Sequence, residues 1–319
     1  MLHRNFLLDP KHGDRYFFTD GCADLSHKEL TKYGIHPVTA PFVIAADGED
    51  VDVTNLNDFY RFLASDDCNP KTLKTASPSP ANIENIIRGI VEATPDYVEI
   101  IYLGVSPHIS AGTFNATNMA MNIFADEYPN RKFTVIDTTC VSNGMGLALQ
   151  YIATYNGENI VEYAETVCNH IMHLFTIRNL SFAMGSGRWN AFQQLGLGAM
   201  NTMGISPNMF FPSNDKLSTA GKARGNIILD EWVRYYYANR ASADGIIRIA
   251  YGHEDEEARA LKFIDKLKAA GDVTDEQIQL TRVGCTIAAH TGPSVLSFFF
   301  MQKDPRPATS KDYVKPPKA

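Results

Sequence analysis

Val98-Glu-Ile-Ile-Tyr-Leu-Gly-Val105 is a nearly unbroken apolar run, and a helical pattern over residues 113–125 follows it closely. A run of this length without polar alternation indicates a strand that is buried on both faces. Phe133-Thr-Val-Ile136 repeats the arrangement, because a helix is expected from about Asn143. Strands separated by helices predict a largely parallel sheet with right-handed crossovers, in which ligands lie at the carboxyl ends of the strands.

The segments on the amino-terminal side continue this alternation. Tyr16-Phe-Phe-Thr19 is a short strand that precedes a helix over residues 25–33, and residues 38–45 are a further strand candidate. Pro80 can open another helix, because its missing N–H is harmless in the first turn. The polar residues expected at the carboxyl edge of the sheet are Asp20, Ser106 and Asp137.

The pattern changes beyond His173, which indicates a second domain. The expected elements are strands at 174–178, 245–250, 279–283 and 285–289, and helices at 220–237 and 254–270. We therefore expect an α/β fold with an N-terminal, Rossmann-like domain over residues 1–172 and a second α/β domain, with a mixed or antiparallel sheet, over residues 173–303. The proline- and lysine-rich residues 304–319 are expected to be a disordered tail.

The composition and net charge of the chain make several classes of partner and location poor candidates. The chain has 319 residues and a formal net charge of -7, so nucleic acid and anionic membrane surfaces are poor default partners. The most apolar run, residues 295–301, is far shorter than the roughly 20 residues of a membrane helix. The amino terminus lacks the features of a signal peptide, and five scattered cysteines fit a reducing compartment. We expect a cytoplasmic protein.

Polar stretches beside apolar segments are the candidate sites. They are Thr75-Ala-Ser-Pro-Ser79, Ser106-Pro-His-Ile-Ser110-Ala-Gly-Thr113, Gly187-Arg188 and Gly284-Cys-Thr-Ile-Ala-Ala-His290-Thr-Gly-Pro293. Hydroxyls ahead of a helix are usually caps, although the same helix start can hold an anion. An arginine fork also suits a carboxylate. Small donors beside apolar walls fit an anionic head group with an apolar tail, which favours a carrier over an enzyme.

Signatures of several enzyme classes are missing. The sequence lacks the dinucleotide fingerprint, the Walker loop and the H-E-x-x-H spacing of a zinc site, so we expect no cofactor and no metal. Gly104-Val-Ser106-Pro-His108 departs from the G-x-S-x-G elbow at its last position. A hydrolase that uses Ser106 or Ser110 with His290 remains as an alternative.

The same segments, in the same order, resemble the DegV family, the bacterial fatty-acid-binding proteins that serve as the B subunit of fatty acid kinase. The family's T-S-Q-P-S resembles residues 75–79, and its S-S-x-L-S-G-T-Y resembles residues 106–114. Its opening T-D-S-x-x-D-L is similar to residues 19–25, and its V-I-D-S stretch to residues 135–146. Its G-G-R-I turn and its closing G-A-H-T-G-P-G resemble residues 186–189 and 288–294.

The resemblance implies a function. A long-chain fatty acid would be buried at the junction of the two domains, and its carboxylate would be presented to a separate ATP-dependent kinase subunit that makes acyl-phosphate for phospholipid synthesis. The chain itself would be a non-catalytic lipid-binding subunit without a cofactor. Its partners would be the fatty acid and the kinase, with no nucleic acid and with room for transient membrane contact.

The head-group residues follow from the same resemblance. Thr75, Arg188 and His290 match family positions near the carboxylate, but the family's second serine falls at Pro107. Either Ser106 or Ser110 takes its place, or the chain binds a different amphiphilic lipid or carboxylate. The predicted ligand-binding residues are Thr75, Ser77, Ser106, Ser110, Thr113, Arg188, His290 and Thr291.

Overall fold

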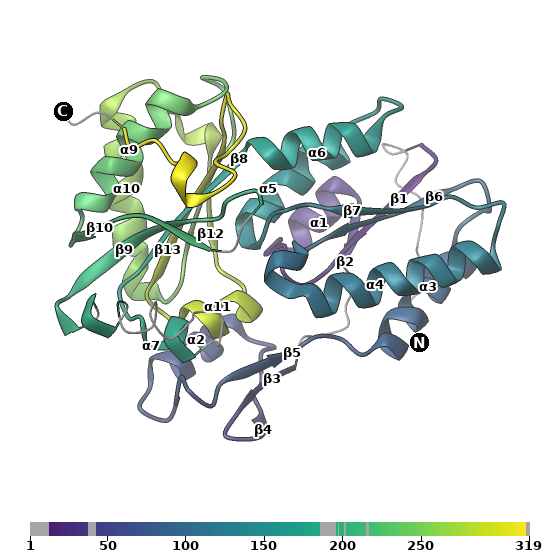
Figure 1. The fold of residues 1–319 in the computed structure, drawn as a ribbon, viewed down its shortest axis with the longest axis horizontal. Helices are drawn as coiled ribbons and strands as arrows, with labels where there is room; N and C mark the ends of the chain where they lie inside the picture. Colours follow the sequence, from purple (N-terminus) through teal and green to yellow (C-terminus); the bar gives the residue numbers. More distant parts are fainter. Residues whose placement is uncertain are drawn as a thin grey trace. The chain divides into compact units, whose positions relative to one another are not determined.

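The computed structural model describes residues 13–37, 43–185, 196, 198–200, 202–214 and 217–316. The chain forms two compact units, which Figure 1 shows coloured along the sequence. The first unit contains Met1–Phe42 and Ser77–Asn169, and the second contains Val43–Ala76 and His170–Ala319. We expected two continuous domains, whereas these units interleave, because a segment from the first half of the sequence belongs to the second unit.

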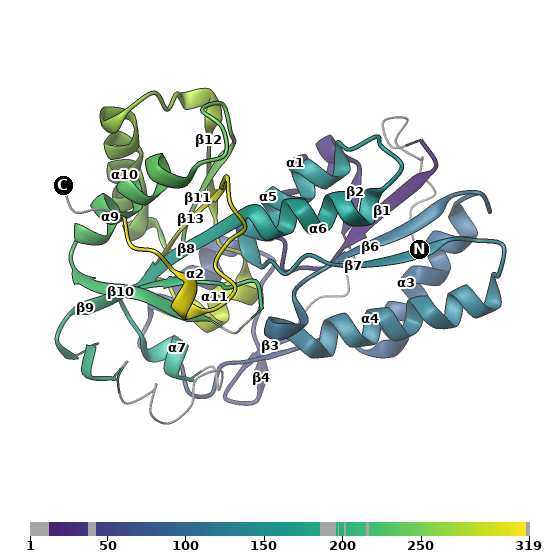
Figure 2. The ribbon, with the colours of Figure 1, turned by 45° about the horizontal axis from the view of Figure 1, so that its top comes forward.

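The first unit is built on a four-stranded sheet in the order β2-β1-β6-β7, with every neighbouring pair parallel. Its strands are β1 (Arg15–Thr19), β2 (Ile35–Pro37), β6 (Glu99–Gly104) and β7 (Phe133–Asp137). One face is covered by α3 (Pro80–Ala93) and α4 (Pro107–Glu127), and the other by α1 (His27–Tyr33), α5 (Ser142–Ala153) and α6 (Ile160–His170) (Figures 1 and 2). The predicted parallel sheet is therefore confirmed.

The core beneath α3 and α4 follows from alternation along the strands. Residues two apart on a strand point to the same face, and residues three to four apart share a helix face. The residues that meet in this way include Tyr16, Phe18, Ile83, Ile87, Ile100, Tyr102, Met121 and Phe124. Helix α3 starts as predicted, with Ser79 as its N-cap and Pro80 in its first turn.

The second unit is built on a six-stranded sheet in the order β10-β9-β8-β13-β11-β12, in which only β11 and β12 are parallel neighbours. Its strands are β8 (Ile171–Ile177), β9 (Ile205–Phe210), β10 (Ser218–Arg224), β11 (Ile247–Tyr251), β12 (Ile278–Arg282) and β13 (Val295–Met301). Helices α9 (Ile227–Asn239) and α10 (Glu257–Ala270) pack on one face through Trp232, Phe263 and Phe298. The mixed sheet expected here is confirmed.

A small three-stranded sheet, in the order β4-β3-β5, also belongs to the second unit. It comprises β3 (Val43–Ala46), β4 (Glu49–Asp50) and β5 (Lys74–Ala76), with α2 (Leu56–Ala64) between the last two. The remaining short elements are α7 (Ser181–Gly185), α11 (Cys285–Thr291) and the 3-10 helices η2 (Glu254–Glu256), η3 (Asp275–Gln277) and η4 (Ser310–Asp312). Among the residues that the structure describes, no helix is long and apolar enough to cross a bilayer.

Two predicted elements were wrong. Residues 285–289 form helix α11 rather than a strand, and the helix ends where the N–H of Gly292 donates to Ala288 O at 2.7 Å. The predicted helix over residues 220–237 starts only at Ile227, because β10 continues to Arg224. Gly225 separates the two elements with a φ of +59°, a conformation that glycine adopts readily and that ends the strand.

Residues 304–316 pack on the second unit, in contrast to the disordered tail that we expected. Arg306 is only 2% exposed and donates from Nη1 to Ile171 O at 3.3 Å. The ring of Tyr313 lies 5.0 Å from that of Phe210 and 5.2 Å from that of Tyr235. Aromatic contacts of this kind stabilise the tail despite its prolines and lysines.

Removing the Tyr313 ring tests whether the tail is part of the core. Tyr313→Ala should lower the free energy of unfolding by about 2 kcal/mol, because a half-buried ring is replaced by a cavity. Urea unfolding followed by circular dichroism measures the change. Val314 is 78% exposed, so Val314→Ala should stay within about 0.5 kcal/mol of the parent protein. Equal effects of the two substitutions would contradict a packed tail.

Candidate functional site

The hydroxyl of Thr75 lies 2.9 Å from Nε2 of His290, although the two residues are 215 positions apart. Thr75 is central in β5, opposite Ile44 of β3, and His290 is in the last turn of α11. Both side chains are half-buried. The structure therefore brings two of the predicted residues together within the second unit.

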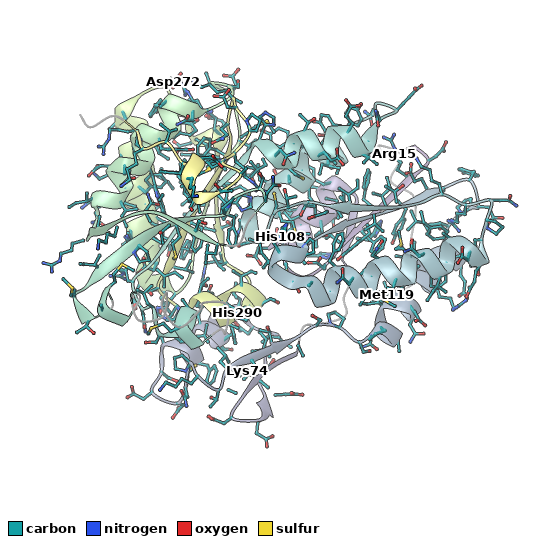
Figure 3. All side chains as sticks on the ribbon, in the orientation of Figure 1. Arg15, Lys74, His108, Met119, Asp272 and His290 are labelled. Atoms are coloured by element: carbon teal, nitrogen blue, oxygen red, sulfur yellow. The ribbon has the colours of Figure 1, made fainter. Side chains whose placement is uncertain are left out.

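The segment that carries Thr75 is fixed to the elements around α11. The buried Tyr60 of α2 donates its hydroxyl hydrogen to Val283 O at 2.9 Å. The guanidinium of Arg282 lies 4.8 Å from the centre of the Tyr60 ring and 5.0 Å from that of Tyr251. In Figure 3, Lys74 of β5 and His290 of α11 lie in neighbouring elements.

The turn that follows α11 requires glycine. Gly292 has a φ of +72°, and a Cβ at this position would lie 2.3 Å from the ring of Phe182. Any side chain would therefore strain the backbone and displace α7. Thr291, the adjacent predicted ligand residue, donates its hydroxyl hydrogen to Ile287 O at 3.1 Å. That bond stabilises the helix end, and a ligand role for Thr291 stays a prediction.

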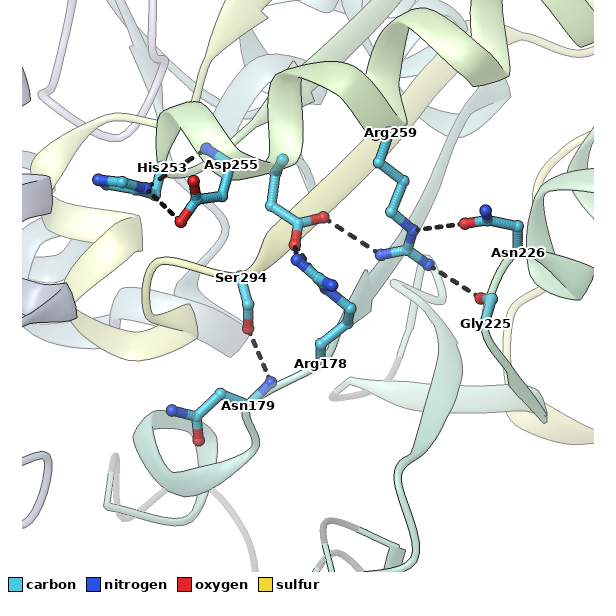
Figure 4. A network of polar contacts seen from close by, with 9 residues as sticks. Arg178, Asn179, Gly225, Asn226, His253, Asp255, Arg259 and Ser294 are labelled. Carbon is cyan, nitrogen blue, oxygen red and sulfur yellow. Dashed lines mark hydrogen bonds and ion pairs between the residues drawn. The ribbon is translucent and has the colours of Figure 1, made fainter.

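Backbone and side-chain bonds then hold this turn against the edge of the sheet. Ser294 stands where the family has glycine, and its Oγ accepts a hydrogen bond from the N–H of Asn179 at 2.7 Å, which Figure 4 shows. The carbonyl of Pro293 accepts from the N–H of His253 at 2.8 Å. The ends of β8 and β11 thus fix the start of β13. The Ser294 side chain therefore positions the turn against the end of β8.

An ion network around the buried Glu256 lies beside this edge (Figure 4). Glu256 is 1% exposed, and its carboxylate accepts from Arg178 Nε at 2.6 Å and from Arg259 Nη1 at 3.3 Å. Burial lowers the pKa of the Arg259 guanidinium, and the Glu256 carboxylate opposes that shift. The pair of Arg178 and Glu256 was not predicted, because 78 residues separate them and no local pattern connects them.

In the first unit, Ser106 is the N-cap of α4. Its Oγ accepts from the N–H of His108 at 3.3 Å, its own N–H donates to Cys140 O at 3.2 Å, and the residue is 2% exposed. Pro107 follows in the first turn and has no N–H to donate. Ser106 thus caps the helix, where we expected a hydrophilic crossover loop as the alternative to a ligand site, and a ligand contact from it stays a prediction.

Three further predicted residues of the first unit form a hydroxyl chain. Ser110 Oγ lies 3.0 Å from Thr113 Oγ1, and Thr113 donates to Ser77 Oγ at 3.0 Å. Ser110 has φ −136° and ψ 72°, so it interrupts α4 and starts a second helical stretch. A Cβ at Gly112 would lie 3.1 Å from Ser77 Oγ, so glycine leaves room for that side chain.

The acidic residues expected at the sheet edge are structural. The buried carboxylate of Asp20 accepts hydrogen bonds from Cys22 N, Tyr102 OH and Val105 N at 2.7 to 2.9 Å. Burial raises the pKa of Asp20, and these hydrogen bonds oppose the shift. Asp137 Oδ1 accepts from the N–H of Thr139 at 2.7 Å. Both carboxylates shape the loops that follow β1 and β7.

Arg188, the remaining predicted site residue, lies outside the described residues.

The sequence of this chain is similar to those of known proteins. The model of the family described as "Uncharacterised protein, DegV family" matches residues 17–303. The chain belongs to the DegV family. A DegV domain-containing protein of Streptococcus pyogenes is 25% identical over 297 residues, which cover 90% of this chain and 98% of the relative. One of Clostridium perfringens is 24% identical over 230 residues, which cover 70% of this chain and 77% of the relative.

Solved DegV structures share the fold. A fatty-acid-binding DegV protein from Thermus thermophilus has a TM-score of 0.74 at 22% identity, covering 91% of this chain and 99% of its own. A DegV protein from Eubacterium eligens, loaded with heptadecanoic acid, has a TM-score of 0.73 at 20% identity, covering 90% of this chain and 99% of its own. At these identities the likeness establishes the fold.

Neutralising Glu256 tests the buried network. Glu256→Gln should lower the free energy of unfolding by about 3 kcal/mol, because the buried Arg259 loses its countercharge. Guanidinium unfolding with tryptophan fluorescence measures the change. The matched control is Glu254→Gln, whose side chain is 70% exposed and which should shift stability by less than about 0.5 kcal/mol. A Glu256 variant as stable as this control would overturn the structural role.

Proposed function

We propose that this DegV protein binds a long-chain fatty acid without catalysing its conversion, and presents the carboxylate to a separate ATP-dependent kinase. The observation that carries the proposal is the contact between Thr75 and His290. A hydroxyl fixed by an imidazole, beside the apolar core of an α/β unit, suits a carboxylate with an apolar tail. The expectation that the acid lies between two domains stays a prediction.

The Thr75 hydroxyl is oriented to donate outward. In the tautomer that carries its hydrogen on Nε2, His290 donates to Thr75 Oγ1. Because a hydroxyl has one hydrogen and two lone pairs, Thr75 can accept from His290 and still donate. Its hydrogen is then available to a carboxylate oxygen, so the head group is bound without a fully buried ion pair.

The tail supplies most of the binding free energy. Burial of an acyl chain contributes about 0.8 kcal/mol per methylene group, part of which offsets the loss of ligand freedom on binding. Hydrogen bonds to the charged head add about 1.5–3 kcal/mol each and fix its orientation. Fatty-acid binding by the T. thermophilus protein and the heptadecanoic acid in the E. eligens structure support a fatty acid as the ligand class.

The chemical step belongs to another protein. The sequence contains no Walker loop, so ATP has to be supplied by a partner. In that step a carboxylate oxygen of the fatty acid attacks the γ-phosphorus of ATP, the bond to the β-phosphate oxygen breaks, and acyl-phosphate and ADP form. This chain contributes by holding the acid out of membranes and by fixing the attacking oxygen.

Head-group substitutions test the proposal through binding. Thr75→Val and His290→Ala should each weaken palmitate binding about tenfold, because the first removes the donor to the carboxylate and the second removes the group that orients it. Neither should change the affinity for hexadecanol, which has the same tail length without the carboxylate. Isothermal titration calorimetry with the delipidated protein measures both ligands.

The control for these variants is Thr72→Val. The Thr72 hydroxyl donates to Asn69 O at 3.0 Å in the turn before β5, so its loss should leave palmitate affinity unchanged. Palmitate affinities that are equal in all three variants and the parent protein would contradict the assigned head-group site.

A separate assay, of ADP release, tests the proposed presentation to a kinase. Wild-type protein loaded with palmitate should support ADP release by an ATP-dependent fatty acid kinase, and His290→Ala should support less at equal loading. Palmitate that is bound but never phosphorylated, with several such kinases, would contradict presentation and leave binding intact.

A further inference from the structure

The loop that connects α5 to α6 in the first unit contains the pair Asn156-Gly157. Asn156 is exposed and Gly157 is half-buried. An asparagine side-chain amide is attacked most readily by the next backbone nitrogen when that residue is glycine, because glycine has no Cβ to shield its nitrogen. Among the described residues, none accepts a hydrogen bond from the N–H of Gly157. The attacking nitrogen is therefore not held in place by a hydrogen bond.

A second Asn-Gly pair in the same unit is protected. Asn143 is 0% exposed and lies with the buried Gly144 in the first turn of α5. The hydrogen bonds of a helix fix its dihedral angles, which direct each backbone nitrogen away from the preceding side-chain amide. Burial also excludes the water that the reaction consumes. The two pairs thus have the same dipeptide sequence but differ in burial and in backbone conformation.

We propose that Asn156 is a site of spontaneous deamidation, with water as the co-reactant. The Gly157 nitrogen forms a bond to the amide carbon of Asn156, its proton passes to the departing amine, and ammonia leaves as a cyclic succinimide forms. Water then adds to one of the two imide carbonyls and breaks the C–N bond at that carbonyl. Cleavage at the side-chain carbonyl gives aspartate. Cleavage at the main-chain carbonyl gives isoaspartate, whose main chain is longer by one methylene group.

Arg15 of β1 makes this loop sensitive to the longer main chain. Its Nη1 donates to Tyr155 O at 3.3 Å, and its Nη2 donates to Gly157 O at 2.7 Å and to Glu158 O at 3.2 Å. One planar guanidinium thus holds carbonyls on both sides of residue 156. A methylene inserted between them moves Tyr155 O away from the other two acceptors, so isoaspartate breaks the set of bonds. Aspartate leaves the main chain unchanged and keeps them.

Peptide mass spectrometry of the full-length protein after incubation at mildly alkaline pH tests the site. Chymotrypsin suits the digestion, because a cut after Leu149 or Tyr151 separates the two Asn-Gly pairs. The peptide with Asn156 should become heavier by one mass unit. The peptide with Asn143 should react at least about tenfold more slowly, because its reaction requires local unfolding.

The control is the same chain unfolded in urea, in which Asn143 and Asn156 should react at similar rates. An isoaspartyl methyltransferase, which labels isoaspartate and not aspartate, identifies the product. Folded protein in which Asn156 stays unmodified, or in which the two asparagines react alike, would overturn the proposal.

Comparison of the two products tests the Arg15 contacts. The deamidated fraction, isolated by anion exchange, should unfold at a lower urea concentration than Asn156→Asp, which has the same charge and an unchanged main chain. This difference should disappear in an Arg15→Lys background, because lysine lacks the planar fork that spans the three carbonyls. Equal midpoints in the parent background would contradict the role of Arg15, and so would a difference that persists with Arg15→Lys.

Discussion

The Arg282 side chain joins the two parts of the sequence that make the Thr75–His290 contact. Its guanidinium lies between the rings of Tyr60 and Tyr251, donates from Nε to Gly252 O at 2.7 Å and reaches Asn57 Oδ1 at 3.0 Å. Stacked arginine keeps its charge while its flat faces pack on aromatic rings. Together with the hydrogen bond from Tyr60 to Val283 O, it holds the segment around α2 and β5 beside β12 and α11.

The proposed head-group site in the second unit pairs a hydroxyl with one histidine. A carboxylate needs donors, but an arginine or lysine fully buried with it would require desolvation of both charges. Thr75 and His290 already bond one another, so under the proposed function the Thr75 donor is oriented before a ligand arrives. Preorganised donors avoid the ordering cost of binding.

Much of the fold was predictable because it depends on local patterns. The run at β6, the proline start of α3 and the alternation of strands with helices each follow from side-chain periodicity. The strand predicted at α11 failed because Ile287, Ala288 and Ala289 fit either element and only the Gly292 stop distinguishes them. The interleaving of the two units was not predictable, because it depends on contacts such as Tyr60 with Val283, which are 223 residues apart.

The candidate site was predictable only in part, because it too depends on contacts between residues far apart in the sequence. The sequence identified Thr75 and His290 as head-group candidates through a resemblance, while their contact required the tertiary structure. The contact of Thr113 with Ser77 also required the tertiary structure, because the two residues are 36 positions apart. Arg178 and Glu256 gave no sequence signal, since ion pairs between distant elements have no fixed spacing.

The most direct measurement is to purify the protein, denature it and identify by mass spectrometry the lipid that it releases. The account predicts a long-chain fatty acid in a near one-to-one ratio with protein. An empty protein that also fails to take up added palmitate would contradict it, and release of a lipid without a carboxylate would contradict the assigned head group.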